Sequence, residues 1–228
     1  MMPGFLSDLF TNPALTTALW PAFVETLLMV GIAGVATVVI GLPLGVVLFV
    51  TQPGGMAANR AVNVVLSGII VNITRSVPYA ILMVSLMPFT RFIVGTSIGP
   101  LAASVSLTIA CVPFFARLVE SGLRDVQPGK VDAAHAMGST RGQTVWKVLL
   151  PEARPSLVAS VTTTLVTLVG YSAMAGLIGG GGLGRLAYNY GYQRFQPEVM
   201  FVVLVLLVVF VQLVQLVGDA VVRRVDHR

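Results

Sequence analysis

Five stretches of the chain are apolar over about 20 residues or more, the length that an α-helix needs to cross the roughly 30 Å hydrocarbon core of a bilayer. They run approximately over residues 23–50, 61–89, 98–118, 157–178 and 199–217. Only 10% of the 228 residues are charged, whereas about a quarter are charged in a soluble domain. The sequence therefore predicts an all-α, polytopic membrane protein with about five transmembrane helices in a single transmembrane domain, residues 1–228.

Basic residues indicate how these helices are oriented, because Lys and Arg in short loops are retained on the cytoplasmic side. Ten of the 14 fall in two loops and the C-terminal tail: Arg60, Arg117, Arg124, Lys130, Arg141, Lys147, Arg154, Arg223, Arg224 and Arg228. Arg91, Arg185 and Arg194 fall in the loops on the other side of the predicted membrane helices. We therefore expect an inner-membrane protein whose N-terminus is outside and whose C-terminus is cytoplasmic. This topology accounts for the net charge of +5 without a nucleic-acid partner.

The largest cytoplasmic loop contains a polar segment, residues 128–151, with the pattern of two short helices. The first would end at Gly138, because glycine favours the position that follows a helix. The second would begin after a cap, Ser139 or Thr140, and end at Pro151. Each helix has an apolar face with basic residues at its edge. Such a pair suits either docking onto another protein or binding to the bilayer surface.

This segment resembles the signature of the permease subunits of ATP-binding cassette (ABC) importers. The signature is Glu-Ala-Ala, three residues, Gly, nine residues, an aliphatic residue, one residue, then Leu-Pro. The matching positions here are Asp132, Ala133, Ala134, Gly138, Val148, Leu150 and Pro151. One position departs from the signature, since Asp132 stands where Glu is usual. The resemblance implies that the loop forms coupling helices, which seat in a groove of the ATP-hydrolysing subunit.

The resemblance to the methionine-uptake branch of this family covers nearly the whole chain. It is carried by residues 75–91, 94–99, 147–153 and 167–176. It implies a type I permease that assembles with a second copy of itself, two ATP-binding subunits and an extracytoplasmic methionine-binding protein. The sequence contains no G-x-x-x-x-G-K-[ST] phosphate-binding loop. We therefore expect ATP and Mg to be bound by the partner ATPase, and this chain to have neither a cofactor nor an enzymatic activity of its own.

Polar residues within membrane helices are costly to place in lipid and often mark functional positions. Arg75 either lines the transport path or sits at a kink beside Pro78, where its side chain reaches the membrane surface or a neighbouring subunit. The fourth predicted helix carries Tyr171, Ser172 and Met174. By resemblance this helix lines the two-fold axis, and Met174 could close the path as a thioether plug. The alternative is that its small residues only allow close helix packing.

The loop that follows the fourth helix is rich in glycine and tyrosine. Its G-x-G-x-x-G pattern follows a membrane helix and no strand, so we do not expect a dinucleotide site. Its glycines suggest a flexible loop, in which Tyr188, Tyr190, Tyr192 and Arg194 are candidates for contact with the binding protein. The alternative for the tyrosines is an aromatic belt at the membrane surface. Neither the two histidines nor the one cysteine has companions that predict a metal or catalytic site.

Two other functions remain open on sequence. A secondary transporter would usually show internal repeats and buried acidic groups for ion coupling, whereas the number of predicted helices is odd and the acidic residues cluster at helix ends. Dependence on ATP and on a partner chain distinguishes this class from an ABC permease. An ABC permease for another amino acid or small metabolite is separated from a methionine permease by resemblance alone.

Overall fold

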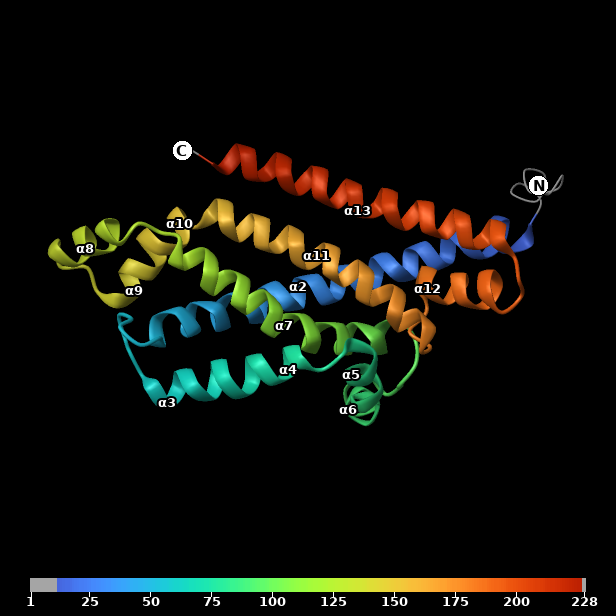
Figure 1. Ribbon diagram of the computed structural model, residues 1–228, viewed down its shortest axis with the longest axis horizontal. Coiled ribbons are helices and arrows are strands. Elements are labelled where there is room, and N and C mark those ends of the chain that lie inside the picture. Colours follow the sequence, from blue (N-terminus) through green and yellow to red (C-terminus); the bar gives the residue numbers. More distant parts are fainter. Residues whose placement is uncertain (1–11, 227–228) are drawn as a thin grey trace. The chain divides into compact units, whose positions relative to one another are not determined.

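The computed structural model describes residues 12–226, and within this range every regular element is a helix. Four of the described helical runs are long and apolar enough to span a membrane. They are η1 with α2 (Ala14–Ala18 and Leu19–Thr51), α7 (Pro100–Arg124), α11 (Arg154–Leu177) and α13 (Pro197–Val225) (Figure 1). The predicted all-α class is confirmed, and four of the five expected spans are continuous helices.

The second expected span is interrupted. Its first part consists of α3 (Arg60–Asn63), the π-helix η2 (Val64–Val71) and α4 (Asn72–Ser76), and α5 (Tyr79–Ser85) follows after a break at Val77 and Pro78. Proline disfavours helical backbone in the residue before it, and Val77 is extended, with φ −86 and ψ 126. The interruption of this span expected near Arg75 and Pro78 is therefore confirmed, as a full break in the helix. A short helix, α6 (Met87–Val94), follows α5.

The chain divides into two compact units, each of which we describe by itself. Unit 1 comprises Met1–Val35, Pro78–Ile109 and Leu165–Val214, and unit 2 comprises Ala36–Val77, Ala110–Thr164 and Gln215–Arg228. The boundaries fall within α2, α7, α11 and α13 and at the break before α5. Each long helix therefore contributes one part to each unit.

Unit 1 has an apolar core where the start of α2 packs against α12 (Gly182–Leu186) and α13. Leu183, Val199 and Val203 are almost completely buried in this core. The ring of Phe23 packs edge-on against Phe210, with centroids 5.8 Å apart. Burial of such large apolar side chains stabilises the contact of α12 with the long helices. The helical turn α12 continues directly into the π-helix η4 (Ala187–Tyr192).

Unit 2 has its own core, in which α2, α7 and the segment between α7 and α11 meet. Phe115, Val119 and Leu123 of α7 are buried with Leu149. Gly45 permits the close approach of α2 to α7, because a Cβ there would lie 2.6 Å from the carbonyl oxygen of Ala116 and from Cβ of Val119. A glycine at such a contact is typical of membrane helix pairs.

Candidate functional site

The predicted coupling loop forms a compact group of helices in unit 2 (Figure 1). They are α8 (Pro128–Ala136), α9 (Arg141–Thr144), the π-helix η3 (Val145–Leu149) and α10 (Leu150–Glu152). Gly138 follows α8 with φ 81, a backbone conformation that glycine adopts without steric cost. Its N–H donates to the carbonyl of His135 at 2.9 Å, and the N–H of Ser139 donates to Ala134 at 3.1 Å. The predicted end of the first helix is therefore confirmed.

The start of the second helix is fixed by Thr140, which resolves the choice between Ser139 and Thr140. The Thr140 hydroxyl accepts from the N–H of Gln143 at 3.3 Å, and the N–H of Thr140 donates to the Gln143 side-chain oxygen at 2.9 Å. This reciprocal pair is a capping box. It satisfies two backbone N–H groups that would otherwise lack partners at the helix start.

Pro151 lies one residue before the end of the second helix, so the predicted end is confirmed to within one residue. The helical run continues to Glu152, with Pro151 in the first turn of α10. Proline has no N–H, so Pro151 cannot donate a backbone hydrogen bond to the preceding turn. The preceding π-helix, η3, bonds residue i to residue i+5, so the hydrogen-bond pattern is already shifted before Pro151 is reached.

The signature residues of the loop divide between a packed inner side and a free outer side. Ala134 is 2% exposed, and Val148, Leu150 and Pro151 are half-buried, whereas Asp132, Ala133 and Gly138 are exposed to solvent. Lys130 on α8 forms an ion pair with Glu152 on α10. The inner side of the loop is thus held to the core of unit 2, and the outer side is available to meet another chain.

Two large apolar side chains lie uncovered on the same loop and were not among the sequence candidates. Met137 is 81% exposed and Trp146 is 73% exposed. Helical periodicity places apolar residues on a face, but it does not show whether another part of the chain covers that face. Exposed apolar side chains beside a polar loop are typical of a surface that contacts a partner.

A buried ion cluster on α7 was also missed by the sequence analysis. Glu120 is 3% exposed, and its carboxylate accepts from Arg117 at 2.7 Å and from Arg124 at 2.5 Å. Arg117 also donates to the Ser67 hydroxyl at 2.6 Å and to the Asn72 side-chain oxygen at 2.9 Å. The cluster therefore ties η2 and α4 to α7. The i, i+3 and i+4 spacing of the charges was the available signal.

The candidate path residues of α11 lie in unit 1. The Ser172 side chain is buried and donates to the carbonyl of Val169 at 2.7 Å. The ring of Tyr171 stacks on Tyr79, with centroids 4.7 Å apart and an interplanar angle of 3°. Met174 remains 38% exposed. Arg75 is an exposed residue of α4, which belongs to unit 2.

The glycine-rich segment after α11 is packed, which corrects the expectation of a flexible loop. Gly181 and Gly182 are buried and have φ 90 and φ 73. The N–H of Gly182 donates to the Glu25 carboxylate at 2.7 Å, and the N–H of Leu183 donates to the Thr26 hydroxyl at 2.9 Å. A Cβ on Gly182 would lie 2.6 Å from that hydroxyl. These glycines let the start of α12 contact α2.

The tyrosine candidates follow on η4, also in unit 1. Tyr188 and Tyr192 stack with their centroids 5.6 Å apart. The guanidinium of Arg194 lies 4.4 Å from the centroid of the Tyr190 ring, within the range of a cation–π interaction. Tyr192 and Arg194 are exposed, whereas the other two tyrosines are half-buried. The structure thus brings the four candidates together on one short helix and its end.

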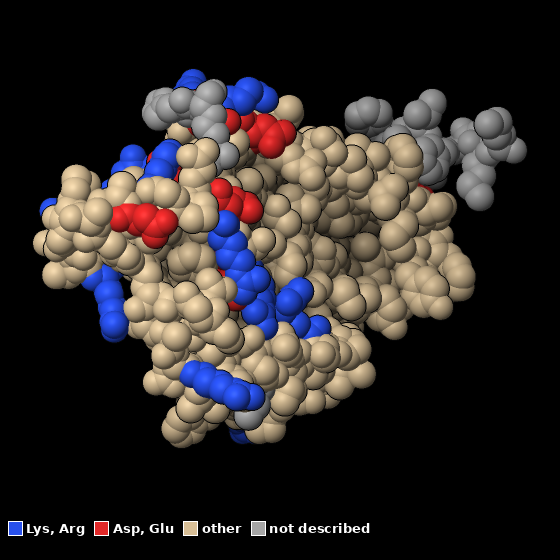
Figure 2. Space-filling model, turned by 60° about the vertical axis from the view of Figure 1, so that its left-hand side comes forward, with Lys and Arg blue, Asp and Glu red and all other residues tan. Residues whose placement is uncertain are grey.

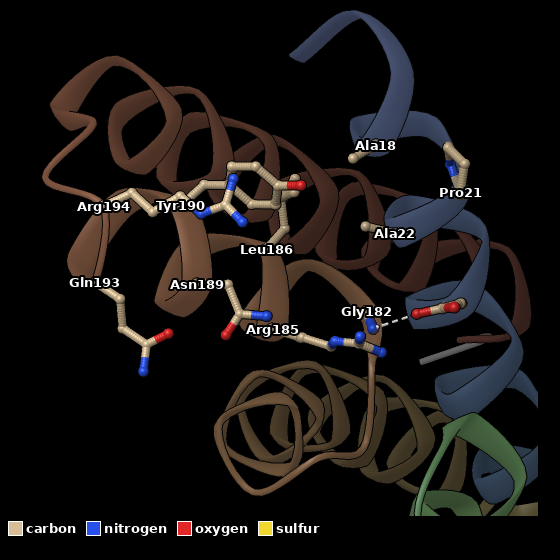
Figure 3. A pocket seen from close by; sticks show the side chains of 11 residues that line it. Ala18, Pro21, Ala22, Gly182, Arg185, Leu186, Asn189, Tyr190, Gln193 and Arg194 are labelled. Atoms are coloured by element: carbon tan, nitrogen blue, oxygen red, sulfur yellow. Dashed lines mark hydrogen bonds between the residues drawn. The ribbon is translucent and has the colours of Figure 1, made fainter. Parts of the chain in front are cut away.

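A pocket of about 600 Å³ lies between the start of α2 and the α12–η4 helix (Figure 3). Its lining consists of Ala18, Pro21, Ala22, Glu25, Gly182, Arg185, Leu186, Asn189, Tyr190, Gln193 and Arg194. Glu25 and Arg185 were not among the sequence candidates, because their proximity depends on how α12 packs. Among the described residues, no group of three or more His, Cys, Asp and Glu side chains could hold a metal ion.

Comparison with known proteins identifies the class. Residues 41–228 match the family model described as "Binding-protein-dependent transport system inner membrane component". The chain belongs to this family.

Two relatives and one solved structure narrow the comparison. The chain is 54% identical over 214 residues to the "Probable D-methionine transport system permease protein MetI" of Vibrio cholerae serotype O1, covering 94% of this chain and 93% of the relative. It is 45% identical over 212 residues to the "Methionine import system permease protein MetP" of Bacillus subtilis, covering 93% and 95%. A structure described as "Inward facing conformations of the MetNI methionine ABC transporter" aligns with a TM-score of 0.91 and 51% identity, over 96% of this chain and 100% of that chain. The predicted permease fold is thereby confirmed.

Proposed function

We propose that this chain is the transmembrane permease subunit of an ATP-driven methionine importer. The similarity to methionine permeases of two organisms, over 93% or more of this chain in both cases, carries the proposal. The chain supplies the translocation path and the coupling surface. ATP and Mg²⁺ are bound and ATP is hydrolysed in separate ATP-binding subunits, so the permease itself needs no cofactor.

The proposed assembly contains two copies of this chain, two ATP-binding subunits and an extracytoplasmic methionine-binding protein, in the inner membrane. The charge distribution supports an orientation with the N-terminus outside. Of the 14 Lys and Arg residues, three belong to unit 1 and the other 11 to unit 2. Figure 2 shows Lys and Arg side chains gathered, with Asp and Glu between them, on the visible face. This distribution favours unit 2 as the cytoplasmic side.

The coupling role rests on the two-sided character of the loop. Its inner side is packed through Ala134 and Leu149, and its outer side presents Ala133, Met137 and Trp146. An element held this way moves with the core of unit 2 when its outer side is displaced by an ATP-binding subunit. Closure of the ATP-binding subunits would in this way change the opening of the path. Tyr188, Tyr190, Tyr192 and Arg194, in a segment that we propose to be external, are the proposed contacts of the binding protein.

Gly138→Trp is expected to reduce ATP-dependent uptake at least tenfold. The expected loss of uptake has a local cause. The φ of 81 at Gly138 is unfavourable for any residue with a Cβ, and the indole ring would also occupy the outer side of the loop. The measurement is uptake of labelled methionine into proteoliposomes that contain the permease, its ATP-binding subunits and the binding protein, with and without internal ATP. Gly142→Ala is the control, since a Cβ on Gly142 would meet no heavy atom within 4 Å and its φ is not positive.

Each alternative has a distinct result in the same assay. Uptake by the wild-type protein without ATP would indicate a secondary transporter. ATP hydrolysis without methionine uptake, together with uptake of another amino acid, would support an ABC importer. It would also show that methionine is not the transported substrate. Normal uptake by Gly138→Trp would show that this loop does not couple ATP hydrolysis to transport.

Met174→Ala is expected to raise the passive leak of methionine and to uncouple ATP hydrolysis from transport. We place Met174 at the gate because its thioether is partly exposed in α11, next to the buried Ser172. Leak is measured as efflux of labelled methionine from liposomes without ATP, alongside basal ATP hydrolysis. Met200→Ala is a matched control, since Met200 is 37% exposed against 38% for Met174. Unchanged leak and coupling in Met174→Ala would exclude the gate.

A further inference from the structure

The pocket between α2 and the α12–η4 helix carries opposite charges that do not neutralise each other directly. Glu25 lines it from α2, and Arg185 lines it from α12. The three ion pairs of the described residues all lie in unit 2 and involve neither residue. In Figure 3 the Arg185 side chain extends toward Gly182, whose N–H is bonded to the Glu25 carboxylate. A space bounded by a carboxylate and a guanidinium is thus left open in this pocket.

The Glu25 carboxylate is held in place but is not saturated. Its Oε2 accepts from the N–H of Gly182 at 2.7 Å, which fixes the carboxylate at the start of α12. A carboxylate has about four lone-pair sites on its two oxygens. Glu25 therefore retains acceptor capacity for an ammonium group within the pocket, and the backbone bond orients it.

The other polar groups lie along the helix in a row. Arg185, Asn189 and Gln193 are spaced four residues apart, so they share one face of the α12–η4 run, and all three line the pocket (Figure 3). Arg194, stacked on Tyr190 at 4.4 Å, adds a second guanidinium. An anionic group at Arg185 would meet guanidinium N–H donors, and charge-assisted hydrogen bonds to guanidinium are the strong ones.

The remaining wall is apolar and small. Ala18, Ala22 and Leu186 line this part of the pocket, and Ala22 and Leu186 are buried in the core of unit 1. The pocket volume of about 600 Å³ lies within the range of small-molecule sites. A ligand with one anionic group, one ammonium group and a short apolar chain matches all three kinds of lining.

We propose that this pocket binds a small zwitterion, with its anionic group at Arg185, its ammonium group at Glu25 and its apolar part against Ala18, Ala22 and Leu186. A free α-amino acid and the headgroup of phosphatidylethanolamine both carry this pair of charges. The use of methionine as the amino-acid probe rests on the proposed function. On the external side of the membrane, the pocket would hold the amino acid next to the surface where the binding protein releases it.

The test is binding of labelled methionine to the permease with its ATP-binding subunits, in nanodiscs of phosphatidylglycerol, which has no amine. Saturable binding is expected, and Glu25→Gln and Arg185→Gln should each weaken it at least tenfold. Glu25→Gln is a sharp variant, because its side-chain oxygen can still accept from Gly182 while the charge is removed. Arg91→Gln is the control, since Arg91 is an exposed arginine of unit 1 that does not line the pocket.

Two competitors test the charges of the ligand, and a second arm tests the lipid. N-acetylmethionine lacks the ammonium group and methionine methyl ester lacks the carboxylate, so neither should compete with methionine. In the lipid arm, native mass spectrometry counts phosphatidylethanolamine retained by the wild-type and Glu25→Gln complexes after purification. One outcome is that the wild-type complex retains phosphatidylethanolamine, the Glu25→Gln complex does not, and methionine does not bind. That outcome would support the zwitterion site and show that its ligand is the lipid.

Binding of neither molecule, or equal binding by the wild-type protein and both pocket variants, would overturn the proposal. The uptake assay keeps this failure separate from failure of the transport function. ATP-driven methionine uptake with no zwitterion bound at the pocket would refute the pocket alone. Zwitterion binding that depends on Glu25 and Arg185, with no ATP-driven methionine uptake, would count against the importer and leave the pocket standing.

Discussion

Gly184→Ala is expected to lower the free energy of unfolding by about 3 kcal/mol or more, at the upper end of the cost of overpacking a core. A Cβ on Gly184 would lie 2.1 Å from the carbonyl oxygen of Ala173 and 2.8 Å from its Cα. These are backbone atoms of α11, which cannot rotate away as a side chain could. The methyl group would therefore push α12 away from α11. The measurement is the mole fraction of SDS at the unfolding midpoint of the purified complex.

Gly31→Ala is the matched control for this substitution. Gly31 lies within α2, and a Cβ there would meet no heavy atom within 4 Å. Alanine is favoured over glycine in a helix by up to about 1 kcal/mol, so this variant should unfold at the same or a higher SDS fraction. A Gly184→Ala protein as stable as the wild type would contradict the close packing of α12 on α11. It would also weaken the pocket, because α12 carries Arg185.

The glycine-rich segment shows where local sequence patterns cease to be informative. The succession of glycines from 179 to 182 suggests flexibility, because glycine has wide backbone freedom. In the structure that freedom is used to bring N–H groups of Gly182 and Leu183 onto Glu25 and Thr26, which lie 157 residues earlier in the chain. A pattern within the segment contains no information about so distant a partner. For the same reason the pocket could not be predicted.

Features that depend on residues adjacent in the sequence were predicted more successfully than features that depend on distant parts of the chain. Apolar length predicted the membrane helices, the positive φ of Gly138 follows from its place after a helix, and Pro78 marks the break before α5. Pro151 likewise marks the end of the second helix to within one residue, but the π-helix before it was not predicted. Such a change of helix type has no simple sequence signal. The limits of the prediction therefore coincide with long-range packing and with irregular helix geometry.

Glu120→Gln is expected to lower the free energy of unfolding by about 1.5–3 kcal/mol, the typical contribution of hydrogen bonds to a charged group. The side chain of Glu120 is 4% exposed and is bonded to two guanidinium groups, those of Arg117 and Arg124. Glutamine has nearly the same shape but no charge, so both cations lose their counter-ion. Arg117 would then also hold Ser67 and Asn72 less firmly, which loosens η2 and α4 from α7. The same SDS unfolding midpoint measures the effect.

Glu152→Gln is the matched control, because Glu152 also pairs with a cation but is more accessible. The side chains of Glu152 and Lys130 are 29% and 46% exposed, and pairs in contact with solvent contribute about 0–1 kcal/mol. A double variant tests the cause: adding Arg117→Leu to Glu120→Gln should cost less than the sum of the two single changes, because it removes an uncompensated cation. Equal midpoints for Glu120→Gln and Glu152→Gln would show that burial does not strengthen the cluster on α7.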